Sequence, residues 1–282
     1  MEIIKQKRLT GERALFFGRD LKVCDCVFSD GESPLKHSEN IELVDSSFEW
    51  KYPVWYSKHI RMENCTFSLA ARAGIWYTED ICICHCKIEA PKTFRRATNI
   101  LLENVTLPNA SETLWECKNV KLHNVKACGD YLAMNCENME IEGLELDGNY
   151  AFDGAKNVVI KNSRLATKDA FWNSENITVI DSEITGEYLG WNSKNLTFIN
   201  CTVESLQGLC YIDGLVMKNC RLKNTTLAFE YSTVEADIEG DIDSVLNPAG
   251  GQITADGIGQ LILEKDRINP AKIKITYRKN DV

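Results

Sequence analysis

Apolar residues of this chain occur in short runs of period two, and the runs themselves recur every 19 to 21 residues. The first apolar residue of each run, which often follows an Asn, serves here as the reference position. Eleven reference positions follow one another at this interval: Leu21, Ile41, Ile60, Ile81, Ile100, Val120, Met139, Val158, Ile177, Leu196 and Leu215. A repeat of this regularity predicts a stack of similar structural units.

Each unit has the same internal order of apolar and turn-forming residues. A second apolar residue stands two positions after the reference, Asn or Asp commonly stands four positions after it, and apolar or small residues stand five and seven positions after it. Period-two stretches separated by Asn or Asp bends are typical of β-strands, and a unit of this length leaves no room for a helix as well. We therefore predict an all-β parallel β-helix with about eleven coils, each containing about three short strands.

The repeat spans most of the chain, so the sequence predicts one domain over residues 1–282. Residues 1–20 are expected to form an irregular first coil or cap, residues 21–233 the regular coils, and residues 234–282 the C-terminal coils and cap. Caps are expected because both ends of such a stack expose unpaired strand edges.

Asn and Cys each occupy their own rows of the repeat. Asn tolerates the left-handed backbone region of a bend, and its amide can hydrogen-bond to the Asn of the next coil. Cys26, Cys65, Cys86, Cys201 and Cys220 stand five positions after the reference, where small apolar residues are expected to fill the core. We interpret most of the cysteines in this way, including those of the Cys82-x-Cys84-x-Cys86 stretch, and expect no metal site and no cofactor.

Five of the six Trp residues stand in one row, five positions before the reference. The row reads Trp55, Trp76, Arg95, Trp115, Met134, Asp153, Trp172, Trp191 and Cys210. The residues just before this row are apolar and those two positions after it are mostly small, so both flanking rows are expected to face inward with a bend between them. Arg95 and Asp153 are rarely buried without partners, which favours an outward row. The alternative is that the indoles lie in the core.

An outward row would form an aromatic strip suited to a ligand. The proposed ligand-binding residues are Trp76, Trp115, Trp172, Trp191, Tyr131, Tyr150 and Tyr188. Aromatic faces stack on the C–H surfaces of sugars, and nearby charged groups bind hydroxyl groups. The same strip is equally suited to a protein–protein interface, including a homo-oligomer.

Charge and hydropathy narrow the range of partners. The net charge is −9 and the chain has no basic run, so neither nucleic acid nor an anionic membrane surface is an expected partner. No apolar run approaches the length of a membrane span, and the first residues lack the pattern of a signal peptide. With twelve Cys and no such pattern, we expect a cytoplasmic protein with reduced thiols.

The stacked Asn-apolar-x-apolar-x-Asn-Cys units resemble the single-stranded right-handed parallel β-helix of the pectate-lyase-like superfamily. More narrowly, the chain resembles an uncharacterised bacterial family of unknown function within it. The resemblance implies a right-handed coil and activities such as polysaccharide lyase or polygalacturonase, with a site in a surface groove along one sheet. The chain lacks the Asp-Asp and Gly-His-Gly motifs of polygalacturonases, and Arg221-Leu222-Lys223 fits their Arg-x-Lys pattern without them.

Carboxylates beside the aromatic row provide a candidate acid–base pair. Asp153 with Glu116, or Asp153 with Asp169, is the best-placed pair, because glycoside hydrolysis uses two carboxyl groups a few ångströms apart. Arg95 would then hold a carboxylate or sulfate group of the substrate. The alternative is a solvated charged face that keeps the molecules apart.

The sequence thus favours a carbohydrate-interacting β-helix protein whose sugar lies along the aromatic strip. Two alternatives remain at this level. The first is a non-catalytic scaffold or protein-interaction module, and the second is a lyase or glycoside hydrolase acting on an oligosaccharide.

Overall fold

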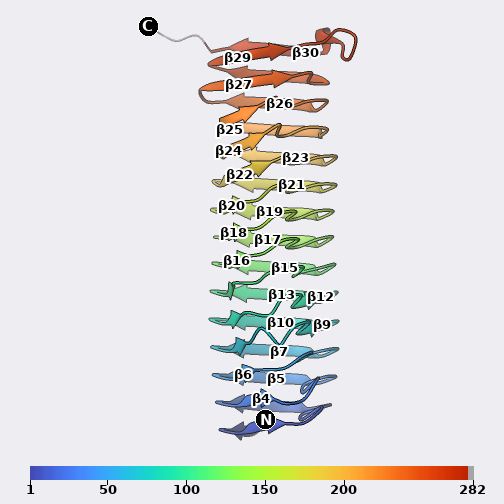
Figure 1. Cartoon of the computed structure of the whole chain (residues 1–282), viewed down its shortest axis with the longest axis vertical. Helices are drawn as coiled ribbons and strands as arrows, with labels where there is room; N and C mark the ends of the chain where they lie inside the picture. The colour runs from blue at the N-terminus through green and yellow to red at the C-terminus, as the bar shows by residue number, and fades with distance from the viewer. Residues whose placement is uncertain (279–282) are drawn as a thin grey trace. The chain divides into compact units, whose positions relative to one another are not determined.

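The computed structural model describes residues 1–278, whose regular elements are short β-strands and one 3-10 turn, Pro270–Lys272. The chain forms two compact units, Met1–Leu146 and Asp147–Val282. Within each unit the chain winds in coils, and equivalent strands of successive coils pair in parallel (Figure 1). That the two units make up one domain stays a prediction, and the last four residues of the predicted cap lie outside the described residues.

In the first unit, two sheets run along the coils. The first sheet contains β1 (Glu2–Lys5), β3 (Arg19–Cys24), β5 (Glu39–Val44), β7 (Lys58–Glu63), β10 (Glu79–Cys84), β13 (Thr98–Glu103), β15 (Lys118–His123) and β17 (Glu137–Glu142). The second contains β2 (Arg8–Thr10), β4 (Val27–Ser29), β6 (Ser47–Phe48), β8 (Thr66–Phe67), β11 (Lys87–Ile88), β14 (Thr106–Leu107) and β16 (Lys126–Cys128). A two-stranded sheet of β9 (Ile75–Trp76) and β12 (Phe94–Arg95) lies in the third side, and β18 (Glu145–Asp147) follows at the end of the unit.

The second unit repeats this arrangement. Its first sheet contains β19 (Lys156–Lys161), β21 (Glu175–Ile180), β23 (Lys194–Ile199), β25 (Asp213–Thr226), β26 (Thr233–Ile238), β28 (Gly250–Ala255) and β30 (Ile273–Tyr277). Its other strands are β20 (Arg164–Ala166), β22 (Glu183–Glu187), β24 (Thr202–Leu206), β27 (Asp241–Leu246) and β29 (Gly257–Ile262). The long strand β25 pairs with both β23 and β24, because it turns from one sheet into the other.

The strand register follows the sequence repeat. Ile81 of β10 pairs with Ile60 on one side and Ile100 on the other, and Ile177 of β21 pairs with Leu196. Reference residues therefore lie beside reference residues. The predicted fold, an all-β right-handed parallel β-helix, is confirmed.

The predicted number of coils was too low. The first sheet has eight strands in the first unit and seven in the described part of the second, fifteen in all rather than about eleven. The additional coils belong to β1, β26, β28 and β30, whose sequences lack the repeating Asn pattern. Their backbones nevertheless pair in register, as Gly251 does with Val234 and Ile273, because the ladder requires only backbone hydrogen bonds.

Left-handed Asn residues form the bends and bond along the coils, as predicted. Asn99, Asn119 and Asn138 have φ values of 57°, 56° and 59°. The Asn119 side chain donates to Asn99 at 2.9 Å, and that of Asn138 donates to Asn119 at 3.2 Å. The second unit has the same ladder, in which Asn195 donates to Asn176 at 2.9 Å. These ladders satisfy side-chain amides that the repeat places at every turn.

The core of each unit consists of stacked rows of like residues. Phe48 lies between Phe28 and Phe67, with ring centroids 4.8 and 4.7 Å away. Eight of the twelve free cysteines are buried, which supports the predicted filling role for that row. Cys82 and Cys84 are half-exposed, however, because they alternate with the inward residues Ile81 and Ile83 on β10. The core interpretation was therefore wrong for these two cysteines.

Candidate functional site

The third side of each coil, which we call the loop face, carries the aromatic row. Ile75 before Trp76 and Thr78 after it are both fully buried, as the sequence predicted for the flanking rows. Trp76 itself is half-buried and lies outside the core. The bend between them comes from Tyr77, whose φ is 57°. A left-handed residue follows each row position, and the indoles of the row lie outside the core, whereas Cys210 at the end of the row is buried. The core alternative is therefore excluded for the Trp residues.

In the first unit the row forms a tight column of Trp55, Trp76, Arg95 and Trp115. The rings of Trp55 and Trp76 stack with centroids 5.1 Å apart and planes 6° apart. The Arg95 guanidinium carbon lies 4.7 Å from the centroid of the Trp76 ring and 4.8 Å from that of Trp115. Both faces of Trp76 are therefore covered, and only the ring edge is available to a ligand.

Hydrogen bonds and ion pairs fix this column further. The Trp76 indole N–H donates to the carbonyl oxygen of Lys92 at 2.8 Å. Glu112 lies 2.9 Å from the Lys92 Nζ and 3.6 Å from an Arg95 nitrogen. The first-unit column is thus held by stacking, by backbone acceptors and by charge.

Glu116, one of the proposed acid–base residues, is engaged in an ion pair. Its Oε2 lies 2.6 Å from the Nε of Arg96. The hydrogen bond from Arg96 lowers the pKa of the Glu116 carboxyl. Glu116 therefore favours the ionised form and is poorly suited to donate a proton.

In the second unit the row forms a looser column of Asp153, Trp172, Trp191 and the neighbouring Tyr211. The Trp172 and Trp191 rings lie 6.1 Å apart with planes tilted by 36°. The ring of Tyr211 lies 4.3 Å from that of Trp191. Asp153 stands one coil before Trp172 and carries no ring. Among the described residues of this unit, the ring contacts of Trp172 are therefore confined to its Trp191 side.

Asp153 and Trp172 are both oriented by neighbours. The Asp153 Oδ1 accepts a hydrogen bond from the Asn173 side chain at 3.0 Å, and Asn192 continues this ladder. The Trp172 indole N–H donates to the Tyr188 carbonyl oxygen at 2.8 Å. These contacts hold a carboxylate and an indole in adjacent coils, about 4.8 Å apart along the stack.

Asp169 lies in the same loop as Trp172, in a row between two tyrosines. The Tyr150 N–H donates to the carbonyl oxygen of Lys168, and the Asp169 N–H donates to that of Glu187, each at 2.8 Å. Tyr150, Asp169 and Tyr188 therefore follow one another in successive coils. Burial, and next the charge of Glu187, raise the pKa of the Asp169 carboxyl.

The structure thus places the predicted residues on the loop faces of both units. Asp153, Asp169, Trp172, Trp191, Tyr150 and Tyr188 share that of the second unit, and Arg95, Glu116, Trp76, Trp115 and Tyr131 that of the first. Asp153 belongs to the second unit and Glu116 to the first, so their proposed pairing stays a prediction. Sequence reasoning missed the ion pair of Lys168 with Glu187, at 2.9 Å, although its spacing of one repeat was the signal.

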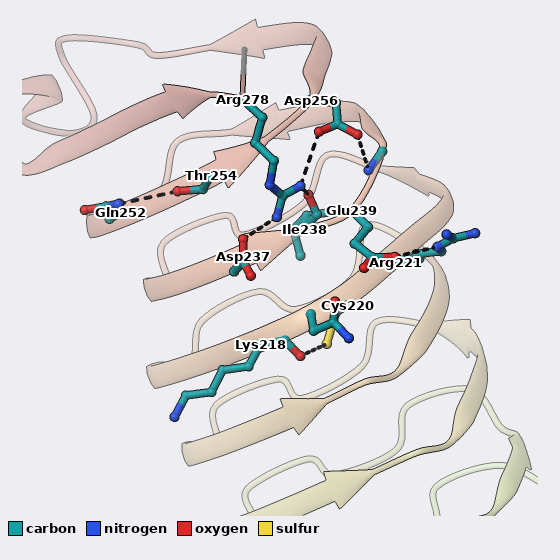
Figure 2. Close-up of polar contacts among 12 residues, drawn as sticks. Lys218, Cys220, Arg221, Asp237, Ile238, Glu239, Gln252, Thr254, Asp256 and Arg278 are labelled. Carbon is teal, nitrogen blue, oxygen red and sulfur yellow. Dashed lines mark hydrogen bonds and ion pairs between the residues drawn. The ribbon is translucent and has the colours of Figure 1, made fainter. Parts of the chain in front are cut away.

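A second polar feature lies at the C-terminal end of the second unit. A groove of about 660 Å³ is lined by Arg221, Lys223, Glu239, Asp256 and Arg278 among others. Figure 2 shows that Arg278 reaches both Asp237 and Asp256, while Arg221 contacts Glu239. The arginines thus tie β25, β26 and the C-terminal segment together.

Within residues 1–278, no group of three or more His, Cys, Asp or Glu side chains is arranged to hold a metal ion. No helix in this part of the chain has the length and apolar character needed to cross a membrane.

The coils and loop faces define a parallel β-helix protein in which each unit carries an aromatic column on its own loop face. The chain belongs to the DUF3737 family, a family of proteins of unknown function, whose model matches residues 2–276. The predicted membership of an uncharacterised β-helix family is therefore confirmed. A search of curated proteins found no match.

Several solved structures are similar at low sequence identity. One is a tailspike protein mutant of E. coli bacteriophage HK620 in complex with a pentasaccharide, with 11% identity, a TM-score of 0.45, and coverage of 91% of this chain and 62% of that chain. A second is PfbA, a surface adhesin of Streptococcus pneumoniae, with 13% identity, a TM-score of 0.39, and coverage of 84% and 71%. A third is the A-module of a mannuronan C-5 epimerase of Azotobacter vinelandii, with 7% identity, a TM-score of 0.32, and coverage of 99% and 90%.

Proposed function

We propose that the protein binds a carbohydrate on the loop face of its second unit, with Trp172 as the stacking platform. The observation that supports this proposal is that the Trp76 ring has a stacking partner on both faces and the Trp172 ring does not. Trp76 is sandwiched between Trp55 and Arg95, whereas the row position before Trp172 is Asp153, which has no ring. An indole face with no ring stacked on it, beside a carboxylate, suits a sugar ring, whose C–H face stacks on aromatic rings and whose hydroxyl groups bind polar groups.

Asp153 and Asp169 supply the polar part of this site. Asn173 bonds to one oxygen of Asp153, and a carboxylate has lone pairs enough to accept further hydrogen bonds from sugar hydroxyl groups. Asp169 lies three residues before Trp172, in the same row as Tyr150 and Tyr188 and one coil from each. The tyrosine hydroxyl groups add donors and acceptors around the same loops.

The ligand we propose is an oligosaccharide or a sugar nucleotide rather than a large polymer. This follows from the predicted cytoplasmic location, since large polysaccharides lie outside the cell. Fractionation of the native cells would test the location, and recovery of the protein outside the cytoplasm would reopen the choice of ligand.

A second candidate function is hydrolysis or elimination at the same site. The raised pKa of Asp169 favours it, because a general acid must hold its proton near the working pH. Asp153 would then be the second carboxyl group of the pair. In the first unit, by contrast, Arg95 and Glu116 already have charged partners, and that column is better suited to a scaffold.

A glycan array combined with a turnover screen tests these functions. We expect the wild type to bind a sugar, and Trp172→Ala and Asp153→Asn to lose that binding. Trp76→Ala is the matched control, because it removes an equivalent indole whose faces are covered. Sugar turnover that Asp169→Asn abolishes would support the enzymatic function. If the wild-type protein bound no sugar, or if Trp76→Ala and Trp172→Ala weakened binding equally, the proposal would be wrong.

A further inference from the structure

The first unit carries a pair of sulfur atoms on the outer side of its first sheet. Cys82 and Cys84 alternate on β10 with the buried residues Ile81 and Ile83, so their side chains share the outward face. Their Sγ atoms are 3.7 Å apart, and both side chains are half-exposed and free. The core does not require these thiols, unlike that of Cys86 in the same stretch.

Charged residues of the neighbouring coils flank this pair. Cys84 pairs in register with Glu63 of β7 and Glu103 of β13. His85 holds Glu63 with a contact of 2.8 Å, and the ring of His123 lies 3.9 Å from Glu103.

The register neighbours of Cys82 differ from those of Cys84. They are Arg61 and Leu101. Cys82 also lines a groove of about 520 Å³ with His59 and Asp80. The dithiol is therefore open to solvent and has carboxylates on two sides of one sulfur.

These surroundings disfavour nucleophilic attack and oxidation by the thiols. Burial, followed by the hydrogen bond with Cys82 and the charges of Cys82, Glu63 and Glu103, raises the pKa of the Cys84 thiol to about 12. A thiol that stays protonated is a slow nucleophile and is slow to oxidise. A disulfide is therefore not the expected state of this pair.

We propose that Cys82 and Cys84 form a dithiolate site for a thiophilic divalent cation of the Zn(II) and Cd(II) type. Two sulfurs bound at about 2.3 Å to one tetrahedral ion lie about 3.8 Å apart, which matches the separation found here. Each thiol gives up one proton on binding, and two thiolates neutralise the charge of the ion.

The bound ion and the two thiolates together carry no net charge, so the nearby carboxylates of Glu63 and Glu103 do not oppose binding. A bare dithiolate beside Glu63 and Glu103 would be repelled, whereas a neutral metal dithiolate is not. The protein supplies only two ligands, so water or a small ligand completes the coordination of the ion. Such an open site differs from a structural zinc site, which has four protein ligands.

Titration of the reduced full-length protein with Cd(II) in the absence of oxygen tests this proposal. The probe is the thiolate-to-cadmium charge-transfer absorbance, with Zn(II) added afterwards as a competitor. We expect one ion per chain, displacement by Zn(II), and loss of the signal in both Cys82→Ser and Cys84→Ser. Cys128→Ser is the matched control, because Cys128 is an exposed cysteine elsewhere on the same unit.

Unfolding would expose the buried cysteines, which could then bind the ion. Circular dichroism before and after each titration therefore checks that the protein stays folded. Native spectra with a signal that requires both Cys82 and Cys84 support the site. The proposal is overturned if the wild type shows no saturable signal. It is also overturned if the Cys82→Ser/Cys84→Ser double variant retains the signal, or if the pair is recovered as a disulfide that does not bind the ion. None of these outcomes depends on sugar binding.

Discussion

The two aromatic columns occupy the same position of the repeat but differ in how their rings are used. In the first unit the indoles of Trp55 and Trp76 are nearly parallel and the Arg95 guanidinium fills the next place in the stack. In the second unit Trp172 and Trp191 are tilted, and Asp153 stands where another ring would continue the column.

Under the proposed function, this difference means that an outward aromatic row is not in itself a binding surface. Stacking along the coils covers the faces of the rings, and sugars need those faces. A ligand site requires an interruption of the column, where one face is left open beside a polar group. Asp153 provides such an interruption in the second unit.

The largest expected effect is on stability, from Trp76→Ala. This change removes a half-buried ring together with its contacts to Trp55 and Arg95 and its indole hydrogen bond. We therefore expect the free energy of unfolding to fall by about 3 kcal/mol. Trp172→Ala should cost about 1 kcal/mol, because its stack is looser. Urea unfolding followed by circular dichroism measures both. Equal losses would remove the contrast between the columns.

A smaller loss is expected from Asn173→Gly in the second unit. Glycine keeps the left-handed bend but removes the hydrogen bonds to Asp153 and from Asn192, so we expect a loss of about 1.5 kcal/mol. The control is Asn119→Gly, which breaks a different Asn ladder, the one from Asn99 to Asn138 in the first unit. If sugar binding survived in Asn173→Gly as fully as in Asn119→Gly, orientation of Asp153 would not matter for the ligand.

Arg95→Lys should have a still smaller effect. Lysine keeps the charge near Glu112 but loses the planar group that lies between Trp76 and Trp115, so we expect a loss of about 1 kcal/mol. Thermal unfolding with the Trp fluorescence signal would report it. A variant as stable as the wild type would mean that charge alone holds this place in the column.

The smallest expected effect is on the pH dependence of stability, and its sign differs between the units. The lowered pKa of Glu116 contributes stability above the ordinary value of 4.5, and this is lost as pH falls through the folded-state pKa. The raised pKa of Asp169 contributes stability below the ordinary value of 3.8, and this is lost as pH rises through its folded-state pKa.

Urea midpoints measured between about pH 3 and pH 7 separate these contributions. Relative to wild type, Glu116→Gln should be less stable at neutral pH, with the difference vanishing in acid. Asp169→Asn should be more stable at neutral pH, with the difference again shrinking in acid. A shift of the same sign in both variants would contradict the assignment of their partners.

The fold could be predicted from the sequence because a coil repeats its inward residues and its bends. The Asn ladders, the Phe and Cys core rows and the bend after each Trp all follow from spacing alone. The coils of β1, β26, β28 and β30 were expected only as irregular terminal coils or caps, and their number and in-register pairing could not be predicted, since backbone pairing there does not depend on the Asn pattern.

The candidate site was predictable only in part. Spacing placed Asp153 and Trp172 in one row, and Asp169 near them. It could not show that Arg95 lies between two indoles, nor that Arg96 engages Glu116, because side-chain direction within a row depends on the neighbouring coils. The distinction between Cys86 in the core and the outward pair of Cys82 and Cys84 was available from spacing, because Cys82 and Cys84 alternate with the inward residues Ile81 and Ile83.

The most direct test of the account is a calorimetric titration of Trp172→Ala and Trp76→Ala with the best sugar ligand of the wild type. The account predicts that Trp172→Ala loses at least about tenfold in affinity, corresponding to about 1.4 kcal/mol, while Trp76→Ala binds as the wild type does. Loss of affinity in Trp76→Ala with none in Trp172→Ala would contradict it.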